Sequence, residues 1–404
     1  MRVAMVNMLH VGSTGKIMFE IAKCARASGH EVRTYSPRLY QSQDTAGLPF
    51  IEQHHYFGSA KEHRMHILLA KATGFHGCFS WIATRQLLKM LDDFQPEVIH
   101  LHNLHNWTVD VGALFSYIKK QNIKVVWTLH DCWSMTGRCA YFTVVACERW
   151  KTGCHHCPSM ESYPSGYVDQ SRTLWKLKKK WFNGVENMLI ITPSQWLAGI
   201  VKQSYLAEYP LKVVNNGINL SVFKVETDIV RNQYGIRDDE YLVLGVAFDW
   251  SMRKGLDVFV HLAARLDKKY RILLVGTDDY VDKRLPDNII SIHRTNNVHE
   301  LALLYNAANV FVNPTREDTY PTTNFEALAC GTPVITFKTG GAPETVDETC
   351  GSVVECNDEE TLEKEIIRVC TERPYTQEAC VRWAKGFDMH ERFEDYVRLY
   401  EEIV

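Results

Sequence analysis

The sequence predicts two doubly wound α/β domains, one after the other along the chain. Three observations predict this class: short runs that are apolar throughout, helical stripes between these runs, and a second round of the same alternation after a polar stretch. Strands that are apolar on both faces are typical of parallel sheets covered by helices on both sides. A length of 404 residues fits this organisation, because domains hold roughly 100–200 residues each.

Each expected strand is a short run rich in β-branched residues. These runs are Val3–Val6, Val98–Leu101, Lys124–Leu129, Leu189–Thr192, Tyr241–Val246, Arg271–Val275, Asn288–Ile292, Val310–Val312 and Pro333–Phe337. Helices are expected between them, where apolar residues such as Val258 and Leu262 recur on one face. The polar stretch 226–240 separates the two sets, so we expect a first domain over 1–222 and a second over 223–387. Ligands of such sheets bind beyond the carboxyl ends of the strands, so the domains are expected to face each other across a ligand-binding cleft.

Composition excludes several classes of protein. The net charge of −3 shows no basic excess, so no nucleic-acid partner is expected. The N-terminal segment MRVAMVNMLHVGSTG is interrupted by polar residues and does not read as a signal peptide, and no apolar run reaches the ~20 residues of a membrane helix. Twelve cysteines in such a chain favour a cytoplasmic location, where thiols stay reduced or bind metal.

A glycine-rich turn, GSTGK at 12–16, follows the first expected strand and opens a helical pattern. Gly12 and Gly15 let the backbone approach a ligand closely, and a helix N-terminus favours an anion. His10 and Ile17 stand where a P-loop needs Gly and then Ser or Thr, so the turn is not a P-loop. Taken alone, the motif fits a phosphate-contacting loop and a plain turn equally well.

Two neighbouring strand ends carry histidines. The stretch HLHNLHN at 100–106 follows one apolar strand, and His130 ends the next. A polar strand end that lines a cleft fits 100–106 better than a metal site, because no carboxylate lies nearby in the sequence. His130 is suited to donate a hydrogen bond or to act as a general base. The alternative for His130 is a histidine that is simply satisfied by packing.

An insertion at 131–171 is long for a strand-to-helix connection and is rich in Cys, Trp, His, Gly and Pro. Its cysteines follow the pattern C-x7-C-x6-C-x2-C: Cys139, Cys147, Cys154 and Cys157. Four thiolates in a short loop suit tetrahedral zinc, so we expect a closed, structural zinc site. The alternatives are reduced thiols in an ordinary loop or a redox pair, and His155 and His156 are competing ligands.

The segment 313–344, NPTREDTYPTTNFEALACGTPVITFKTGGAPE, predicts a strand, an acidic loop, a helix, a second strand and a glycine pair. Carboxylates at a strand end accept hydrogen bonds from sugar and ribose hydroxyls, a role that suits Asp318 and Glu326. The first amides of the helix are suited to phosphate oxygens. They belong to Thr322, Thr323 and Asn324. Arg253 and Lys254, after the first strand of the second domain, suit a clamp on a diphosphate.

Together these motifs resemble those of retaining glycosyltransferases of the GT-B fold, family 4. The resemblance covers almost the whole chain and rests on the glycine loop at 12–15, His130, NNGIN at 215–219, RKG at 253–255, and EDTYPTTNFEALACGTPV at 317–334 with its trailing GGAPE. It implies two Rossmann-like domains, the first binding the acceptor and the second the nucleotide-sugar. It also implies that a helix at 388–404 crosses back to the first domain.

The resemblance assigns roles to residues that match the family pattern. Glu326 would hold the ribose, and Asp318, where the family has Glu, would contact sugar hydroxyls. His130 would contact the transferred sugar. Arg253 and Lys254, with the amides near Gly15 and at 322–324, would stabilise the departing diphosphate. The acceptor would bind near His102, Asn103 and His105.

The implied reaction moves a sugar, with retention, from a UDP- or GDP-sugar to a glycan or lipid-linked glycan. The histidine-rich strand end and the cysteine-rich loop resemble the branch that builds bacterial capsular polysaccharide, exopolysaccharide and O-antigen. No D-x-D motif occurs in the chain, which fits catalysis without a metal cofactor. Two alternatives stay open. One is a non-catalytic nucleotide-sugar-binding subunit, and the other is a nucleotide-sugar epimerase of the same fold.

A basic and aromatic segment, WKLKKKWF at 175–182, is suited to an anionic membrane surface, as a lipid-linked acceptor requires. The alternative is a solvated helix face with two buried tryptophans. The expected location is therefore the cytoplasm, with peripheral contact at the inner face of the membrane.

Overall fold

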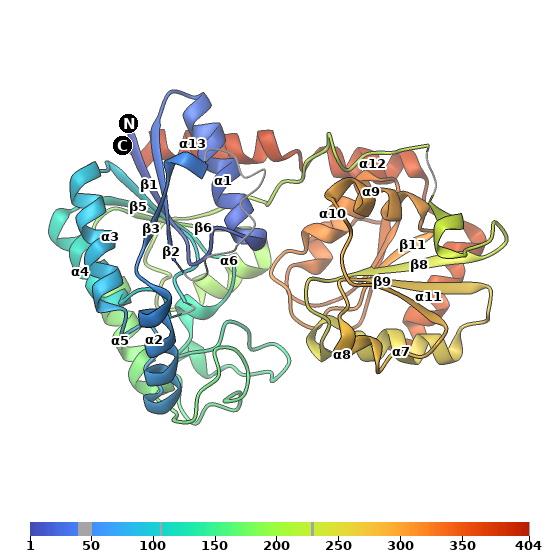
Figure 1. Ribbon diagram of the computed structural model, residues 1–404, viewed down its shortest axis with the longest axis horizontal. Coiled ribbons are helices and arrows are strands. Elements are labelled where there is room, and N and C mark those ends of the chain that lie inside the picture. The colour runs from blue at the N-terminus through green and yellow to red at the C-terminus, as the bar shows by residue number, and fades with distance from the viewer. Residues whose placement is uncertain (39–50, 106, 228–229, 404) are drawn as a thin grey trace. The chain divides into compact units, whose positions relative to one another are not determined.

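A computed structural model describes residues 1–38, 51–105, 107–227 and 230–403, and the chain forms two compact units in it (Figure 1). The first unit is Met1–Asn215 with Arg392–Val404, and the second is Asn216–Glu391. The sequence places the boundary at 222, whereas the units divide just before Asn216. The reason is local: the Ile218 amide donates to Phe387 O at 2.9 Å, and the Met389 amide donates to Ile218 O at 3.0 Å. These two bonds join Ile218, within the NNGIN segment, to residues of the second unit.

The described residues of the first unit form a seven-stranded parallel sheet in the order β3-β2-β1-β4-β5-β6-β7. Its strands are β1 (Arg2–Val6), β2 (Glu31–Pro37), β3 (His54–Phe57), β4 (Val98–Leu101), β5 (Lys124–Thr128), β6 (Met188–Thr192) and β7 (Leu211–Val213). Its helices are α1 (Gly12–Ala27), α2 (Ala60–Thr73), α3 (Trp81–Phe94), α4 (Val111–Gln121), α5 (Ser171–Phe182) and α6 (Gln195–Lys202). Ser59, Asp110 and Ser194 each accept a hydrogen bond from an amide of the following turn and so begin α2, α4 and α6.

The described residues of the second unit form a six-stranded parallel sheet in the order β10-β9-β8-β11-β12-β13. Its strands are β8 (Tyr241–Val246), β9 (Tyr270–Val275), β10 (Ile289–Ile292), β11 (Val310–Asn313), β12 (Val334–Phe337) and β13 (Gly351–Val354). Its helices are α7 (Leu256–Arg265), α8 (Asp279–Asp282), α9 (Val298–Ala307), α10 (Thr322–Ala329), α11 (Glu359–Glu372) and α12 (Gln377–Lys385). In each unit, helices cover both faces of the sheet (Figure 1).

The predicted fold class is confirmed, and every strand expected from the sequence is present within a residue or two. The central strands are buried on both faces, as their continuous apolar runs require; residues 3–6 of β1 are at most 1% exposed. Four strands were not predicted, namely β2, β3, β7 and β13. The strands β3, β7 and β13 are edge strands of three or four residues, and β2 is interrupted by polar residues, so none of the four has the continuous apolar run that identified the others.

The chain ends in helix α13 (Met389–Ile403), whose residues from Arg392 onward belong to the first unit. The hydroxyl of Tyr400 lies 2.5 Å from His100 Nδ1, and the ring of Tyr396 stacks on the same histidine. His100 Nε2 lies 2.8 Å from Thr128 Oγ1 on the neighbouring strand. Residues of the terminal helix thus make buried polar contacts with the first unit, where the helix was expected to lie.

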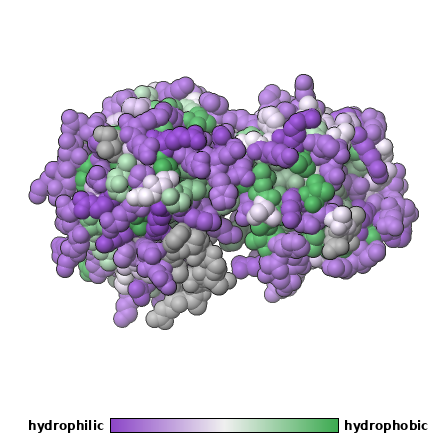
Figure 2. All heavy atoms as spheres, turned by 90° about the horizontal axis from the view of Figure 1, so that it is seen from above, coloured by the Kyte–Doolittle hydropathy of each residue, from purple (hydrophilic) through white to green (hydrophobic). Residues whose placement is uncertain are grey.

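None of the helices that the structure describes has the length and apolar character needed to cross a bilayer. The face shown in Figure 2 is mostly hydrophilic, and its hydrophobic residues gather in small groups.

Candidate functional site

In the second unit, the loops that follow β8, β11 and β12 come together at one edge of the sheet. The amide of Arg316, after β11, donates to Arg253 O, after β8, at 2.8 Å. The amide of Gly341, after β12, donates to Asp318 O at 3.2 Å. Since all strands of this sheet are parallel, these loops lie at the carboxyl ends of the strands, where open α/β sheets bind their ligands.

The predicted basic and acidic residues meet in these loops. Lys254 Nζ lies 2.6 Å from Asp318 Oδ2, and the two side chains are 20% and 18% exposed. The guanidinium of Arg253 donates to Glu317 O at 3.1 Å. A close, partly exposed pair of opposite charges offers a ligand a cation and an acceptor at adjacent positions. The structure therefore brings Arg253, Lys254 and Asp318 together, as the sequence predicts.

Helix α10 begins in the same group of loops. Thr322 and Thr323 open the helix and are half-buried, so their amides lie at its positive end. Asn324 has a different place. Its side chain is fully buried, accepting a hydrogen bond from Asn313 Nδ2 at 2.8 Å and donating one to Thr345 Oγ1 at 2.7 Å. Asn324 thereby holds the helix start to β11 and to the turn after β12.

Glu326 lies in the middle of α10, half-buried. Its Oε2 accepts a hydrogen bond from the hydroxyl of Tyr305, on α9, at 3.0 Å. Burial raises the pKa of Tyr305 far above its ordinary value, so the phenol remains a donor. A carboxylate can accept several hydrogen bonds, as recognition of ribose hydroxyls requires.

Gly340 has no room for a side chain. Its φ is +55°, and a Cβ built there lies 1.8 Å from Asp318 O. Gly340→Ala is therefore expected to displace the loop that carries Asp318, lowering the free energy of unfolding by about 1–3 kcal/mol and weakening nucleotide binding. Denaturant unfolding and a nucleotide titration measure the two effects.

Gly235→Ala is the matched control for Gly340→Ala. Gly235 also has positive φ, +67°, but a Cβ there meets nothing within 4 Å. Gly235→Ala should therefore lower the free energy of unfolding by about 1 kcal/mol and leave nucleotide binding unchanged. Equal effects of the two substitutions on nucleotide binding would contradict the role given to the contact with Asp318.

In the first unit, the glycine loop opens α1, as expected. A Cβ at Gly15 would lie 2.5 Å from the carbonyl carbon of His10, so only glycine fits the turn. Asn7, at the end of β1, ties this loop to the next strand: its Oδ1 accepts from the Asn103 amide at 3.2 Å, and its Nδ2 donates to Thr14 Oγ1 at 3.2 Å. Gly12, with φ +74°, stands at the start of the helix with open space around its α-carbon.

Beyond β4 and β5 the histidines form a buried network with Asp131. His105 Nε2 lies 2.6 Å from Asp131 Oδ2, and the hydroxyl of Tyr163 lies 2.8 Å from His105 Nδ1. His102 Nδ1 lies 3.1 Å from His130 Nε2, with the two rings stacked. In the contact between His102 and His130, one ring nitrogen must donate and the other accept. This contact therefore fixes the orientation of both rings.

Burial and neighbouring groups together set the charges in this network. Burial lowers the pKa of His130 to about 4, although the adjacent Asp131 acts in the opposite direction. Burial alone would raise the pKa of Asp131, but His105 and the Trp133 amide outweigh it and hold that pKa below its ordinary value. At neutral pH the site thus presents a neutral His130 beside an ionised Asp131.

The residues expected near the acceptor are interior residues of this network. His102 is fully buried, His105 is 5% exposed and Asn103 is 9% exposed. Their side chains or amides already bind Asn7, His130 and Asp131. Acceptor contact by His102, Asn103 and His105 stays a prediction, whereas the contacts of His102 with His130 and of His105 with Asp131 are visible. Asn106 lies outside the described residues.

Known families account for both halves of the chain. A model described as "Glycosyltransferase Family 4" matches residues 14–222, and one described as "Glycosyl transferases group 1" matches residues 240–372. The chain belongs to glycosyltransferase family 4. The putative colanic acid biosynthesis glycosyl transferase WcaC of Escherichia coli (strain K12) is 26% identical to this glycosyltransferase over 322 residues, 76% of this chain and 77% of the relative.

Solved structures share the fold of the glycosyltransferase over its full length. Sucrose-phosphate synthase from Thermosynechococcus elongatus has a TM-score of 0.74 at 18% identity, covering 100% of this chain and 98% of its own. Anabaena Alr3699/HepE in complex with UDP-glucose has a TM-score of 0.69 at 15% identity and covers 99% of both chains. The likeness shows the fold, GT-B, with two parallel-sheet α/β domains.

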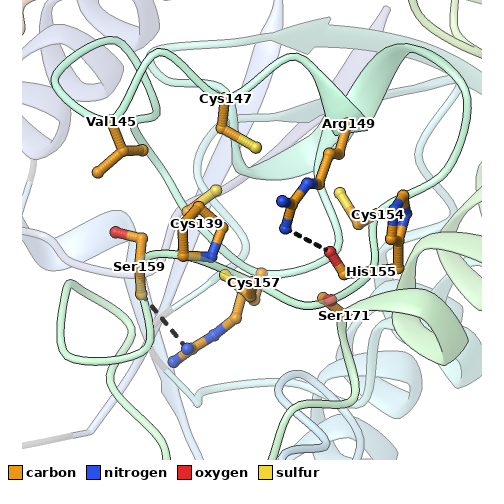
Figure 3. A pocket seen from close by; sticks show the side chains of 11 residues that line it. Cys139, Val145, Cys147, Arg149, Cys154, His155, Cys157, Ser159 and Ser171 are labelled. Carbon is orange, nitrogen blue, oxygen red and sulfur yellow. Dashed lines mark hydrogen bonds between the residues drawn. The ribbon is translucent and has the colours of Figure 1, made fainter.

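The cysteine-rich insertion of the glycosyltransferase lies between β5 and α5. Its described residues form 3₁₀ turns at Trp133–Met135 and Arg149–Lys151 and otherwise irregular backbone. The four predicted metal ligands line one small pocket (Figure 3). Within residues 1–38, 51–105, 107–227 and 230–403, no three His, Cys, Asp or Glu side chains stand in an arrangement that holds a metal ion. The expectation of zinc is therefore not supported by the side-chain positions as they stand.

Segment 175–182 packs its aromatic residues inward. Phe182 is buried, Trp175 Nε1 donates to Trp150 O at 2.8 Å, and the ring of Trp181 lies against Gly112. The exposed residues are Lys176, Lys179 and Lys180. The alternative reading, a helix with buried aromatic residues and a solvated basic face, describes this segment better than a membrane-inserting stripe.

Sequence reasoning missed several polar residues at these sites. Tyr163 gave no signal, because it lies in an irregular loop 58 positions from its partner His105. Tyr305 gave no signal either, because it lies among the buried apolar residues of α9. Lys178 did carry a signal: it lies four residues from Leu174 and four from Phe182, on the buried face of α5. That spacing identifies a lysine whose ammonium group must find partners in the interior.

Proposed function

We propose that the chain is a retaining glycosyltransferase that works without a catalytic metal. It moves a sugar from a UDP- or GDP-sugar to a glycan or a lipid-linked glycan in the synthesis of a bacterial surface polysaccharide. The observation that carries the proposal is the convergence of Arg253, Lys254, Asp318 and the start of α10 at the strand ends of the second unit.

The main task of the enzyme in this reaction is to stabilise the negative charge that forms on the leaving group. As the bond from the anomeric carbon to the phosphate oxygen breaks, negative charge collects on the nucleoside diphosphate. Lys254 and Arg253 supply positive charge, and the amides of Thr322 and Thr323 supply hydrogen-bond donors. These protein cations take the place that a divalent metal fills in other transferases, which agrees with the absence of a D-x-D motif.

Retention follows from attack on the face that the leaving group vacates. The acceptor hydroxyl forms the new bond to the anomeric carbon, and its proton passes to an oxygen of the departing phosphate. Glu326 holds the ribose and Asp318 contacts sugar hydroxyls. His130, kept neutral by burial, donates to or accepts from a hydroxyl of the transferred sugar.

The named relatives support the nature of donor and product. Alr3699/HepE has been solved with UDP-glucose, and the E. coli relative is named for colanic acid biosynthesis. A lipid-linked acceptor would bring the enzyme to the cytoplasmic face of the membrane. The exposed lysines of α5, Lys176, Lys179 and Lys180, would then contribute electrostatic attraction to anionic headgroups without insertion.

The first test is a thermal-shift panel of uridine, guanosine and adenosine diphosphates and their sugars, in EDTA. A ligand that binds the folded state at 100 times its Kd stabilises it by about 2.7 kcal/mol, which gives a clear shift of the melting temperature. We expect one nucleotide to stand out. No shift with any of them, for folded protein, would contradict a metal-independent donor site.

His130→Ala separates catalysis from mere binding. We expect the variant to keep its nucleotide-induced thermal shift and to lose sugar transfer. If transfer by the wild type is absent with the donor that binds, across glycan and lipid-linked acceptors, the non-catalytic subunit becomes the better description. Interconversion of the donor sugar without transfer would identify an epimerase instead.

A further inference from the structure

The four cysteines of the insertion surround one cavity. Cys139, Cys147, Cys154 and Cys157 come from separate parts of the irregular loop, yet all line a cavity of about 20 Å³ (Figure 3). A space of this size holds a single water-sized particle and excludes a sugar or a nucleotide. Cys154 is 8% exposed, and the other three are half-buried.

A backbone amide and two arginines lie at the cavity. The Gly137 amide donates to Cys154 Sγ at 3.1 Å, a type of bond that stabilises metal-bound thiolates. The Cys157 amide donates to Asp169 Oδ2 at 2.8 Å, which fixes the backbone of that ligand. Arg138, 2% exposed, and Arg149 also line the cavity.

Lys178 provides a second, independent indication. It is fully buried, and its ammonium group donates to the carbonyls of Trp133 and Thr136 at 2.8 and 3.1 Å. Among the described residues it forms no ion pair with a carboxylate, and a buried charge without a counter-charge is costly. Burial lowers the pKa of Lys178 to about 7.

We propose that Cys139, Cys147, Cys154 and Cys157 bind one zinc ion, and that buried Lys178 balances the charge of the resulting site. Four thiols lose four protons to solvent as Zn²⁺ binds, leaving a tetrathiolate centre of net charge −2. Lys178 and Arg138 offset that charge from the interior side. Binding requires the four sulfurs to move to Zn–S distances of about 2.3 Å.

The ion would hold the insertion in place beside the histidine network. Arg138, next to Cys139, donates to Pro164 O and to Ser159 O, and Tyr163 reaches His105 from the same stretch. At the other end of the insertion, the Cys132 amide donates to Ala140 O at 2.9 Å. Zinc would therefore act as a positioning element for Asp131 and His105, not as a catalytic ion.

The test is the metal content of the intact protein, purified without added chelator and measured by mass spectrometry of the elements. We expect about one zinc per chain. Replacement by Co²⁺ should give the visible absorption of a tetrahedral thiolate centre. Reaction with a thiol reagent should show four cysteines that become reactive only after a strong chelator removes the metal.

Matched variants distinguish the ligands from other thiols. Cys154→Ser and Cys157→Ser should abolish zinc binding, whereas Cys24→Ser, a half-buried cysteine on α1, should retain it. Lys178→Met should weaken zinc affinity by about 10- to 100-fold in competition with a chelator. Lys179→Met, exposed on the same helix, should leave that affinity unchanged.

Two results would overturn the proposal. One is folded wild-type protein that contains no zinc and develops no cobalt absorption after reconstitution. The other is a disulfide between any two of the four cysteines in the native protein, found by mass spectrometry after alkylation, which would identify a redox pair. Since both results come from the wild-type chain, a variant that fails to fold does not affect them.

Discussion

Lys254→Ala is expected to lower kcat by about 10²- to 10³-fold at saturating donor and acceptor. Removing one well-placed group that stabilises charge in a transition state typically has this effect. Lys254 Nζ stands 2.6 Å from Asp318 at the strand ends of the second unit, with Arg253 one residue before it. When the diphosphate departs, its charge should draw the ammonium group away from Asp318, so the loss falls mainly on turnover. Steady-state rates of nucleotide release measure it.

Lys268→Ala is the control for Lys254→Ala. Lys268 is an exposed lysine of the same unit. Its replacement should leave kcat unchanged, and Lys254→Arg should restore part of the lost rate because it keeps the charge. The ion pair itself adds about 1 kcal/mol or less to stability, so Lys254→Ala should melt near the wild-type temperature. A Lys254→Ala enzyme with full turnover would remove the basic clamp from the mechanism.

The grouping of Arg253, Lys254 and Asp318 was predictable from the sequence because these residues lie in loops that follow strand ends. Short apolar runs fix where each parallel strand stops, and parallel strands bring those ends to one edge. Arg253 and Asp318 are far apart in the chain, yet each directly follows a strand that is easy to recognise. The sequence could not show that Asn324 is structural, because its partners Asn313 and Thr345 depend on how three loops pack.

The histidine network of the first unit was less predictable. The histidines after β4 and β5 were recognised as a group, but their division into pairs was not. His105 binds Asp131, and His102 binds His130. This pairing depends on the directions of the side chains beyond the strand ends. Tyr163 enters from the irregular insertion, for which no periodicity exists. Lys178 is buried against expectation, although its helical spacing placed it on the apolar face.

Acid is expected to unfold the first unit before the second. The first unit buries several histidines whose pKa burial lowers: to about 3 for His54, His66, His76 and His100, to about 4 for His130, and far below 6.5 for His102. Unfolded histidine has a pKa of about 6.5. Between pH 6.5 and 4 the unfolded chain therefore binds more protons, so stability falls as the pH falls through this window.

The loss of stability from buried histidines at acid pH is comparable to a large part of the free energy of unfolding of a domain. At pH 5, each histidine that stays neutral when folded costs about 2 kcal/mol relative to pH 8. Two such groups remove about 4 kcal/mol from a total that is typically 5–15 kcal/mol. The described histidines of the second unit are all exposed, so that unit has no comparable penalty in this window. They are His261, His293, His299 and His390.

Tryptophan fluorescence and far-UV circular dichroism, followed from pH 8 to 4, measure the two units separately. Most tryptophans, including the buried Trp127 and Trp133, lie in the first unit, so fluorescence should change at higher pH than the dichroism of the whole chain. His66→Asn, whose amide can keep the bond that His66 makes to Ser80 at 2.6 Å, should move the acid midpoint to lower pH, and His261→Asn should not. A midpoint indifferent to His66→Asn, or loss of both signals together, would show that carboxylates rather than buried histidines govern the acid transition.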